Sequence, residues 1–405
     1  MRILFVTNLY PRPDQPARGM FNAQTVRELS RDQPVAVRVL VPEWRFWRWP
    51  ALRGWTPPEG EKRVAYWPVF YLPGVGRSLG HLAYRWSVGR ELAAALRDCE
   101  GVLVPWLYPD GCAVASVAAE LGRRPWMMAL GSDTFHLRSL WRRRAILKAS
   151  RNAGGIICVC RTVADRLTDA GVDPGKVHVV PNGVNAEQFH FRSASDALAE
   201  LHGRNPEGAA RAAAAREEGG RIVLAVGNLV PVKGLDFAIK AFAALRANAV
   251  GSGAVSLFVI GSGPQRRMLE RLARRLGVFG SVHFLGSRPH REVALWMNVA
   301  DVLCLPSRSE GMPNVVIEAL VSGLPVAATR VGDCPEMLAG EPAARLCECD
   351  SIAGMASGLR QLLDAPSGRE ALAGRHTERY SWRSQAEAIL RLMTGRRTVE
   401  ANTNP

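Results

Sequence analysis

Two glutamates stand on either side of a predicted helix start. Glu310 lies in a polar segment that follows the apolar run 302–305, and Glu318 lies five residues beyond Pro313. Pro313 has the position of the first residue of a helix, where its missing N–H leaves no hydrogen bond unmade. A helix start carries free amide donors and partial positive charge, so it is a natural site for an anion. The amides that we expect at this end belong to Gly311, Met312 and Asn314.

An anion site with a carboxylate on each side fits a nucleotide-sugar. The diphosphate would meet the helix start, Glu310 would accept hydrogen bonds from sugar hydroxyls, and Glu318 would accept them from the ribose. The alternative is that both glutamates are solvated charges of a loop and a helix. The surrounding pattern, a short strand followed by Pro-Ser, Glu-Gly-x-Pro and a helix, favours the ligand site.

A cationic side chain is predicted to face the same ligand. Lys233 lies between a predicted strand at 221–226 and a predicted helix at 235–247. The apolar run 302–305 is predicted for the same sheet, and ligands of open α/β sheets bind at the carboxyl ends of strands. We therefore expect Lys233 to hold a diphosphate as a point charge, the alternative being an ordinary solvated lysine.

A pair of glycines follows the next predicted strand, 256–260. Gly261-Ser-Gly263 has the start of a dinucleotide-binding fingerprint but lacks its third glycine and the acidic residue about 20 positions further on. The pair instead predicts a tight turn that lets the backbone come near the nucleotide.

The first half of the chain has polar residues after two predicted strands. The run 2–7 leads into a loop from Asn8 to Gly19, and Gly19 would let the backbone approach a phosphate or an acceptor. A later apolar run leads into a segment with Asp133 and His136, which we expect on the floor of a cleft. The alternatives are an ordinary turn glycine and a structural histidine.

Short apolar runs alternate with helical patterns in both halves, which indicates crossover connections and parallel sheets. We place an N-terminal domain at 1–190, a linker region with some helix at 191–220, a C-terminal domain at 221–375, and a last helix with its tail at 376–405. The other expected strands are 35–41, 102–105, 126–130, 155–160, 177–180, 282–285 and 325–329, and the other expected helices are 20–31, 78–97 and 112–121.

Length and composition indicate a globular chain of two domains, with 405 residues of which 47% are hydrophobic and 22% charged. No apolar run reaches the ~18–20 residues that span a bilayer, and 3–6 is too short for the core of a signal peptide. We therefore expect the chain in the cytosol. The 8 cysteines form no C-x-x-C pair and no zinc spacing, so free and mostly buried thiols are expected.

The net charge of +15 is concentrated in the first half. Residues 1–185 hold 26 Lys and Arg against 15 Asp and Glu, together with nine of the 11 Trp. Basic residues mixed with Trp suit an anionic membrane surface, and the densest segments are 43–49 and 138–144. A solvated basic face with Trp in the core is an equal alternative. Nucleic acid is a third, for which no motif is present.

The patterns together resemble the retaining nucleotide-sugar glycosyltransferases of family 4, which have the GT-B fold. The resemblance runs over nearly the whole chain and is strongest from 221 to 337. The matching motifs are Val180-Pro-Asn-Gly-Val184, Gly227-Asn-Leu-Val-Pro-Val-Lys-Gly234, Gly261-Ser-Gly-Pro264, Ala300-Asp-Val-Leu-Cys-Leu-Pro-Ser307, Glu310-Gly-Met-Pro-Asn-Val-Val-Ile-Glu-Ala319 and Gly323-Leu-Pro-Val326.

The resemblance implies an α/β fold with two Rossmann-like parallel-sheet domains that face each other across a cleft. The first domain would bind the acceptor and the second the donor, and the last helix, about 382–393, would cross back to the first domain. Asn228 stands where the family has an arginine, and Leu130 stands where it has a histidine. Whether His136 replaces that histidine stays open.

By the same resemblance, Lys233 holds the diphosphate, Glu318 the ribose, and Glu310 the donor sugar together with the neighbouring amides. The candidate catalytic residues are Lys233, Glu310 and Asp133, and the candidates on the acceptor side are Asn8, Gly19 and His136. The candidates for binding the donor are Asn228, Lys233, Gly263, Glu310, Gly311, Met312, Pro313, Asn314 and Glu318.

The implied reaction is transfer of a sugar from a UDP- or GDP-sugar to an acceptor hydroxyl with retention of the anomeric configuration. The acceptor would be a glycan, for example one linked to a polyprenyl diphosphate at the inner membrane face, and no nucleic acid is expected as a partner. The sequence has no Asp-x-Asp motif, so neither a metal nor another cofactor is expected. The alternatives are an epimerase or hydrolase of nucleotide-sugars and a non-catalytic protein that binds them.

Overall fold

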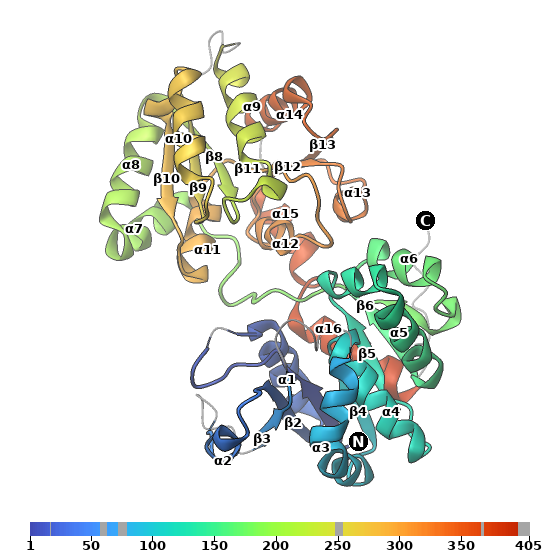
Figure 1. Ribbon diagram of the computed structural model, residues 1–405. Coiled ribbons are helices and arrows are strands. Elements are labelled where there is room, and N and C mark those ends of the chain that lie inside the picture. Colours follow the sequence, from blue (N-terminus) through green and yellow to red (C-terminus); the bar gives the residue numbers. More distant parts are fainter. Residues whose placement is uncertain (17, 57–62, 72–78, 248–253, 366–367, 396–405) are drawn as a thin grey trace. The chain divides into compact units, whose positions relative to one another are not determined.

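Apolar strands of three to eight residues form two parallel sheets. The computed structural model describes residues 1–16, 18–56, 63–71, 79–247, 254–365 and 368–395. The chain divides into two compact units, one of Met1–Gly183 with Trp382–Pro405 and one of Val184–Ser381 (Figure 1).

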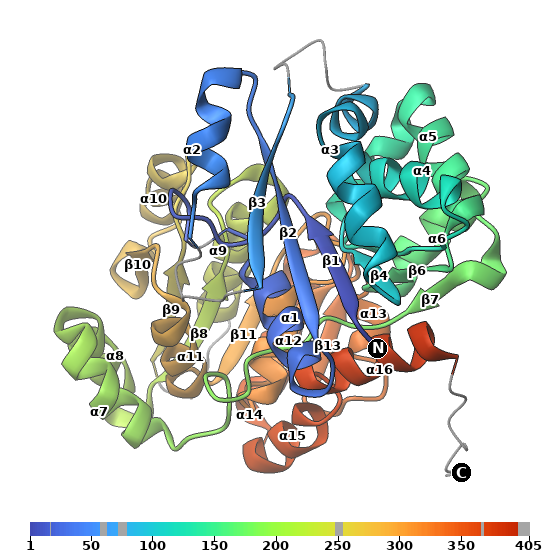
Figure 2. The ribbon, with the colours of Figure 1, turned by 90° about the horizontal axis from the view of Figure 1, so that it is seen from below.

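The first unit has, in its described part, a sheet of seven parallel strands in the order β3-β2-β1-β4-β5-β6-β7 (Figure 2). Its strands are β1 Ile3–Thr7, β2 Val35–Pro42, β3 Val64–Val69, β4 Gly101–Val104, β5 Trp126–Ala129, β6 Gly155–Cys158 and β7 Val177–Val179. Its helices are α1 Met20–Asp32, α2 Trp49–Arg53, α3 Gly80–Arg97, α4 Cys112–Glu120, α5 Leu140–Asn152, α6 Arg161–Asp169 and α16 Trp382–Thr394.

Successive residues of β1 point to opposite faces of this sheet, as the period of a strand requires. Ile3 and Phe5 are buried in the core that α1 and α16 cover, whereas Leu4 and Val6 are buried in the core that α3 and α4 cover. All four side chains are buried because helices cover both faces, which explains why the strand is a continuous apolar run.

The second unit has, among the residues described, a sheet of six parallel strands in the order β10-β9-β8-β11-β12-β13. Its strands are β8 Arg221–Val226, β9 Val255–Ile260, β10 Val282–Gly286, β11 Val302–Leu305, β12 Val326–Thr329 and β13 Ala344–Cys347. Its helices are α7 Ala194–Arg204, α8 Pro206–Arg216, α9 Leu235–Ala247, α10 Arg266–Arg275, α11 His290–Val299, α12 Asn314–Val321, α13 Cys334–Met337, α14 Ile352–Asp364 and α15 Arg369–Thr377.

The same alternation builds two cores in this unit. Ile222 and Leu224 of β8 pack in the core on the side of α11 and α12, and Val223 and Ala225 pack in the core on the side of α9 and α14. The prediction of two Rossmann-like parallel-sheet domains is therefore confirmed. Every strand predicted from an apolar run is present, with ends that shift by at most two residues.

Two edge strands were not predicted. Strand β3 contains Pro68, and β13 contains Arg345 and has only four residues, so neither gives the continuous apolar run of a buried central strand. Both are at sheet edges. The predicted start of α3 at Ser78 lies outside the described residues.

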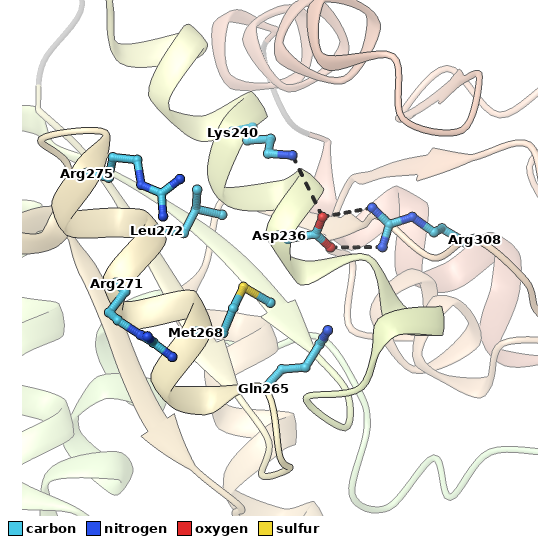
Figure 3. A pocket seen from close by; sticks show the side chains of 8 residues that line it. All are labelled: Asp236, Lys240, Gln265, Met268, Arg271, Leu272, Arg275 and Arg308. Atoms are coloured by element: carbon cyan, nitrogen blue, oxygen red, sulfur yellow. Dashed lines mark hydrogen bonds and ion pairs between the residues drawn. The ribbon is translucent and has the colours of Figure 1, made fainter.

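An arginine ties α9 to the loop that follows β11. The guanidinium of Arg308 donates two parallel hydrogen bonds of 2.9 Å to the carboxylate of Asp236, in the first turn of α9 (Figure 3). It also donates to Asp350 at 2.8 Å. Because a bidentate contact of this kind fixes orientation as well as distance, it fixes the start of α9 relative to the loop after β11.

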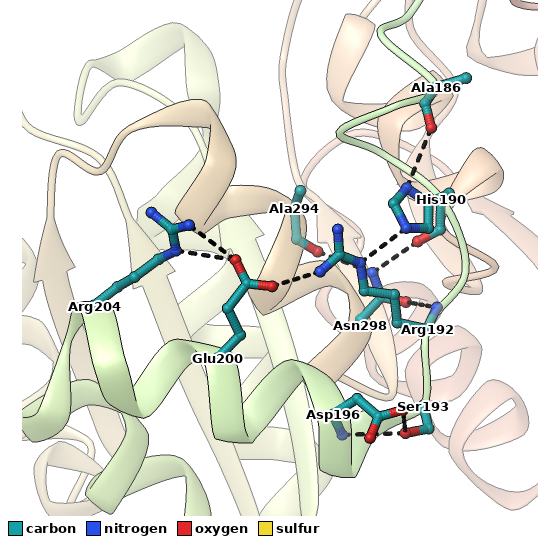
Figure 4. A network of polar contacts seen from close by, with 9 residues as sticks. All are labelled: Ala186, His190, Arg192, Ser193, Asp196, Glu200, Arg204, Ala294 and Asn298. Carbon is teal, nitrogen blue, oxygen red and sulfur yellow. Dashed lines mark hydrogen bonds and ion pairs between the residues drawn. The ribbon is translucent and has the colours of Figure 1, made fainter.

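The region predicted as a linker, 191–220, instead contributes helices α7 and α8 to the second unit, which begins at Val184. A polar network holds its first residues (Figure 4). Asn298 of α11 accepts a hydrogen bond from the amide of Arg192 at 2.8 Å, and Arg192 donates to Glu200 of α7 at 2.5 Å. The contact between Arg192 and Asn298 joins residues 106 positions apart, so periodicity along the chain gives no sign of it.

Candidate functional site

The second sheet reverses its strand order between β8 and β11, and the predicted donor residues lie beside this point. Lys233 follows β8 and Glu310 follows β11, and these two strands are neighbours in the sheet. The ammonium of Lys233 donates a hydrogen bond of 2.7 Å to Oε1 of Glu310, which also accepts one of 2.6 Å from the hydroxyl of Ser307. Such a reversal is where open α/β sheets bind their ligands.

The loop with Glu310 is held from both sides by hydrogen bonds to its main chain. The amide of Arg308 donates to the carbonyl of Val232 at 2.8 Å, and the amide of Asp333 donates to the carbonyl of Gly311 at 2.9 Å. The hydrogen bonds from Arg308 also keep the pKa of Asp236 below its usual value, so this carboxylate stays ionised and the link stays charged. Glu310 is thus positioned by a fixed backbone.

The helix start is one residue later than predicted. Pro313 is the residue before α12, with φ −75° and ψ 106°, and the helix begins at Asn314. The prediction that Pro313 is the first helical residue is therefore wrong, because its ψ is extended. No side chain caps this end, and within the described residues the amides of Gly311 and Met312 donate no hydrogen bond. The donors expected for an anion are present.

Glu318 lies on α12 with only 13% of its side chain exposed. The imidazole of His290, the first residue of α11, lies close to it, at 3.8 Å from Nδ1 to Oε1. Burial raises the pKa of the Glu318 carboxyl from 4.5 to about 7. A buried carboxyl with unused acceptor capacity fits the predicted contact with ligand hydroxyls.

The turn after β9 lies directly against the turn after β8. The amide of Leu229 donates to the carbonyl of Ser262 at 2.9 Å, and the amide of Gln265 donates back to Leu229 at 3.1 Å. A side chain at Gly263 would overlap the Leu229 backbone, so this position needs a glycine. Asn228 is exposed on the same pair of turns, beside the Lys233 loop.

The first sheet reverses its order between β1 and β4, and Asn8 lies there. Its amide and its side chain donate to the two carboxylate oxygens of Asp110, at 2.6 and 3.1 Å. Burial raises the pKa of Asp110 to about 7. Gly19, at φ +63°, packs its α-carbon against the carbonyl of Leu9, a position that a larger residue could not take. Gly19 thus fixes the loop.

Asp133 and His136 occupy one short helical turn, Ser132–Arg138, of the first unit. Asp133 has no exposed surface, and its oxygens accept hydrogen bonds from the amides of Gly131 and Leu107, at 3.1 and 3.4 Å. This burial favours a positioning role over the predicted catalytic one. His136 is half-buried and contacts Arg142 at 3.1 Å, and burial together with this cation lowers its pKa.

Several site residues were missed by sequence reasoning. Ser307 and Arg308 lie inside the motif that was singled out, whereas Asp110 could have been found as the acid that follows the strand next to β1. His290 has no signal in the sequence, because its approach to Glu318 joins two separate helices. Among the described residues, no group of three or more His, Cys, Asp or Glu is placed to hold a metal.

Two predictions from composition can be compared with the structure. All 8 cysteines are free thiols and six of them are buried, which confirms the prediction for these side chains. In the part of the chain that the structure describes, no helix combines the length and the apolar character that crossing a bilayer requires.

The two units define a two-domain α/β protein with parallel sheets, and comparison with known families makes this class specific. The family described as "Glycosyltransferase Family 4" matches residues 22–188, and the family "Glycosyl transferases group 1" matches residues 207–379. Together these matches span most of the chain. The protein belongs to the family 4 glycosyltransferases, and the predicted family is confirmed.

Curated relatives are similar over part of their length. A GDP-mannose-dependent α-(1-6)-phosphatidylinositol monomannoside mannosyltransferase of Mycolicibacterium smegmatis is 27% identical over 63% of this chain and 66% of its own. A D-inositol 3-phosphate glycosyltransferase of Streptomyces griseus is 33% identical over 56% of this chain and 50% of its own. The chain thus matches between about half and two-thirds of these relatives.

Solved structures agree with the fold along nearly the whole chain. HepE of Anabaena, in complex with UDP, has a TM-score of 0.73 at 16% identity, with 98% of this chain and 100% of that chain covered. WaaG, a glycosyltransferase involved in lipopolysaccharide biosynthesis, has a TM-score of 0.64 at 19% identity, with 97% and 100% covered. The predicted GT-B fold class is confirmed.

The raised pKa of Glu318 predicts a stability effect that depends on pH. The folded carboxyl has a pKa of about 7, whereas an ordinary glutamate carboxyl has a pKa of 4.5, so the folded state loses stability as pH rises between these two values. We expect the free energy of unfolding of Glu318→Gln, measured by chemical denaturation, to rise by about 2–3 kcal/mol relative to that of the parent protein as pH increases from 5 to 8. Glu336→Gln, at an exposed position, is the control. Parallel pH curves for Glu318→Gln and the parent would contradict the assignment.

Proposed function

We propose that this protein transfers a sugar from a UDP- or GDP-sugar to an acceptor hydroxyl and retains the anomeric configuration. The observation that carries the proposal is the contact between Lys233 and Glu310 at the reversal of the second sheet, beside the uncapped start of α12. A cation and free amides at one place suit a diphosphate, and a carboxylate beside them suits sugar hydroxyls.

The donor would bind through groups that are already positioned. An ammonium has three donors, so Lys233 can keep its contact with Glu310 and still reach a phosphate oxygen. The amides of Gly311 and Met312 would bind other oxygens of the diphosphate, and Glu318 would accept hydrogen bonds from the ribose. Similar proteins support both a GDP-sugar and a UDP-sugar as the donor, because one relative is GDP-mannose-dependent and one similar structure holds UDP.

In the reaction, the bond between the anomeric carbon and the diphosphate oxygen breaks as the acceptor oxygen attacks from the same face. The proton of the acceptor hydroxyl passes to an oxygen of the departing diphosphate, so charge and atoms balance without a protein nucleophile. Lys233 and the start of α12 stabilise the negative charge that builds up on the leaving group, which is electrostatic preorganisation. Closure of the two domains would exclude water.

The acceptor would bind to the first unit, beside Asn8, Gly19 and His136. We propose a glycan acceptor, for example one carried by a polyprenyl diphosphate, and hence work in the cytoplasm at the inner membrane face. Asp110 and Arg18 support this placement, since they fix the loop from β1 beside the reversal of the first sheet: Arg18 donates to the carbonyl of Asn8 at 3.1 Å. No metal is part of this proposal.

Incubation of the purified protein with UDP- and GDP-sugars tests the proposed reaction. A product in which NMR shows the donor's own anomeric configuration, formed only when an acceptor is present, is expected. An epimerase would change the donor without an acceptor, and a binding protein would leave it intact. Either result, or an inverted product, would contradict the proposal.

Removal of the ammonium at Lys233 should abolish most of the transfer. We expect Lys233→Ala to lose about 10²–10³-fold in kcat, because the charge on the departing diphosphate loses its strongest partner. Arg221→Ala removes a cation from the first residue of β8, the strand that precedes the Lys233 loop, and should retain activity. Circular dichroism should show both variants folded. Near-normal transfer by Lys233→Ala would exclude this residue from the reaction.

An aromatic patch on the first unit supports a membrane partner. Trp47 and Trp86 expose 71% and 70% of their surface, and the ring of Phe46 contacts those of Phe70 and Trp86, at centroid distances of 5.3 and 6.3 Å. Exposed Trp side chains favour the level of the lipid headgroups. Glu43 lies in the same stretch and pairs with Arg45 and Arg48, so the aromatic rings rather than these two charges would give most of the local affinity.

Flotation with anionic vesicles should depend on this patch. We expect Trp47→Ser combined with Trp86→Ser to weaken vesicle binding about tenfold or more, since each buried Trp contributes more than a kilocalorie per mole. Ile352→Ser, at an exposed apolar position of the second unit, is the control. A parent protein that does not float, or a double variant that floats equally well, would rule out this surface.

A further inference from the structure

A cationic cavity lies between helices α9 and α10 of the second unit. It measures about 380 Å³ and is lined by Asp236, Lys240, Gln265, Met268, Arg271, Leu272, Arg275 and Arg308 (Figure 3). Four of these side chains are cationic and one is a carboxylate. Lys233, Glu310 and Glu318 are not among the lining residues, so this cavity is not the proposed donor site.

The carboxylate that lines the cavity already has cationic partners. Asp236 accepts both hydrogen bonds from Arg308, and Lys240 is 3.9 Å away from it. Arg271 and Arg275, one helical turn apart on α10, have no carboxylate partner among the described residues. The cavity therefore holds an excess of positive charge that its own acid does not neutralise.

The other arginines of α10 do not line the cavity. Arg266 pairs with Glu270 at 2.5 Å, and the guanidinium of Arg274 lies 3.9 Å from the ring centre of Phe279. Like charges that face one cavity repel each other, so Arg271 and Arg275 beside Lys240 cost the folded state free energy unless an anion joins them. Arg267 likewise has no ion pair among the described residues, so what distinguishes Arg271 and Arg275 is that both line the cavity.

The uncharged lining residues indicate which groups a ligand would carry besides its anionic group. In Figure 3, Met268 and Leu272 lie between the arginines of α10 and Asp236, so the cavity has an apolar part beside its charges. Gln265 reaches toward the same space from the start of α10, and its buried Oε1 has no hydrogen-bond partner in the described part of the chain. A hydroxyl group of a ligand can supply the missing donor.

We propose that this cavity is a second anion site, which binds a small phosphate-bearing polyol. Lys240, Arg271 and Arg275 hold the phosphate, Met268 and Leu272 contact the carbon skeleton, and Gln265 accepts a hydrogen bond from a hydroxyl. The size suits such a ligand, since pockets for small molecules begin at about 300 Å³. The same chemistry occurs in a free polyol phosphate and in the headgroup of a phospholipid.

Titration with glycerol 3-phosphate tests whether the cavity binds a free polyol phosphate. Vesicles of phosphatidylcholine with or without phosphatidylglycerol test whether it binds the headgroup of a phospholipid. Both probes carry a phosphate on a glycerol unit. The measurements use the full-length protein and its Lys233→Ala variant, so that binding at the proposed donor site is not mistaken for binding here. Failure of this second site leaves the transferase proposal untouched, because the two sites share no lining residue that the test changes.

The decisive variant is Arg271→Gln combined with Arg275→Gln, and Arg267→Gln combined with Arg274→Gln is its control. Both pairs remove two charges from α10, but only the first pair lines the cavity. We expect the first pair to weaken binding about tenfold or more and the control to stay within about twofold, as the loss of charge-assisted hydrogen bonds predicts.

Each outcome decides the proposal. A selective loss of glycerol 3-phosphate binding supports a free ligand, and a selective loss that appears only with phosphatidylglycerol vesicles supports a lipid headgroup. Equal losses in the two pairs would mean unspecific attraction to a basic helix. That result, or a parent protein that binds neither probe, overturns the proposal.

Discussion

The ion pair of Lys233 and Glu310 is the interaction on which the rest of this account depends. It joins the loops after two neighbouring strands, β8 and β11, at the place where the second sheet reverses its strand order. Only there do two adjacent loops leave the sheet toward opposite faces and open a space between them. A cation, a carboxylate and the free amides before α12 are thereby brought together by sheet topology.

The surrounding contacts make this arrangement stiff before any ligand arrives. The guanidinium of Arg308 binds Asp236 of α9, and the amide of Asp333 donates to the carbonyl of Gly311. Preorganised groups contribute more to a charged transition state than mobile ones, because they need no rearrangement during the reaction. The first unit repeats the principle with Asn8 and Asp110, where the acid lies in the segment Leu107–Gly111 that follows β4, the neighbour of β1.

Central strands and motif-bearing loops could be predicted from the sequence because their signals are local. A strand buried on both faces is a continuous apolar run, and Lys233, Glu310 and Glu318 each follow a recognisable element. Contacts between distant segments left no such signal. The amides of Gly131 and Leu107 donate hydrogen bonds to Asp133, and the position of this residue among the catalytic candidates did not indicate these contacts. The approach of His290 to Glu318 likewise depends on helix packing.

The most direct test of the central claim is a crystal structure of the protein with UDP or GDP bound. The account predicts diphosphate oxygens within about 3 Å of Nζ of Lys233 and of the amide of Gly311 or Met312, with the ribose next to Glu318. A nucleotide bound at another place, with Lys233 still directed at Glu310 alone, would contradict it.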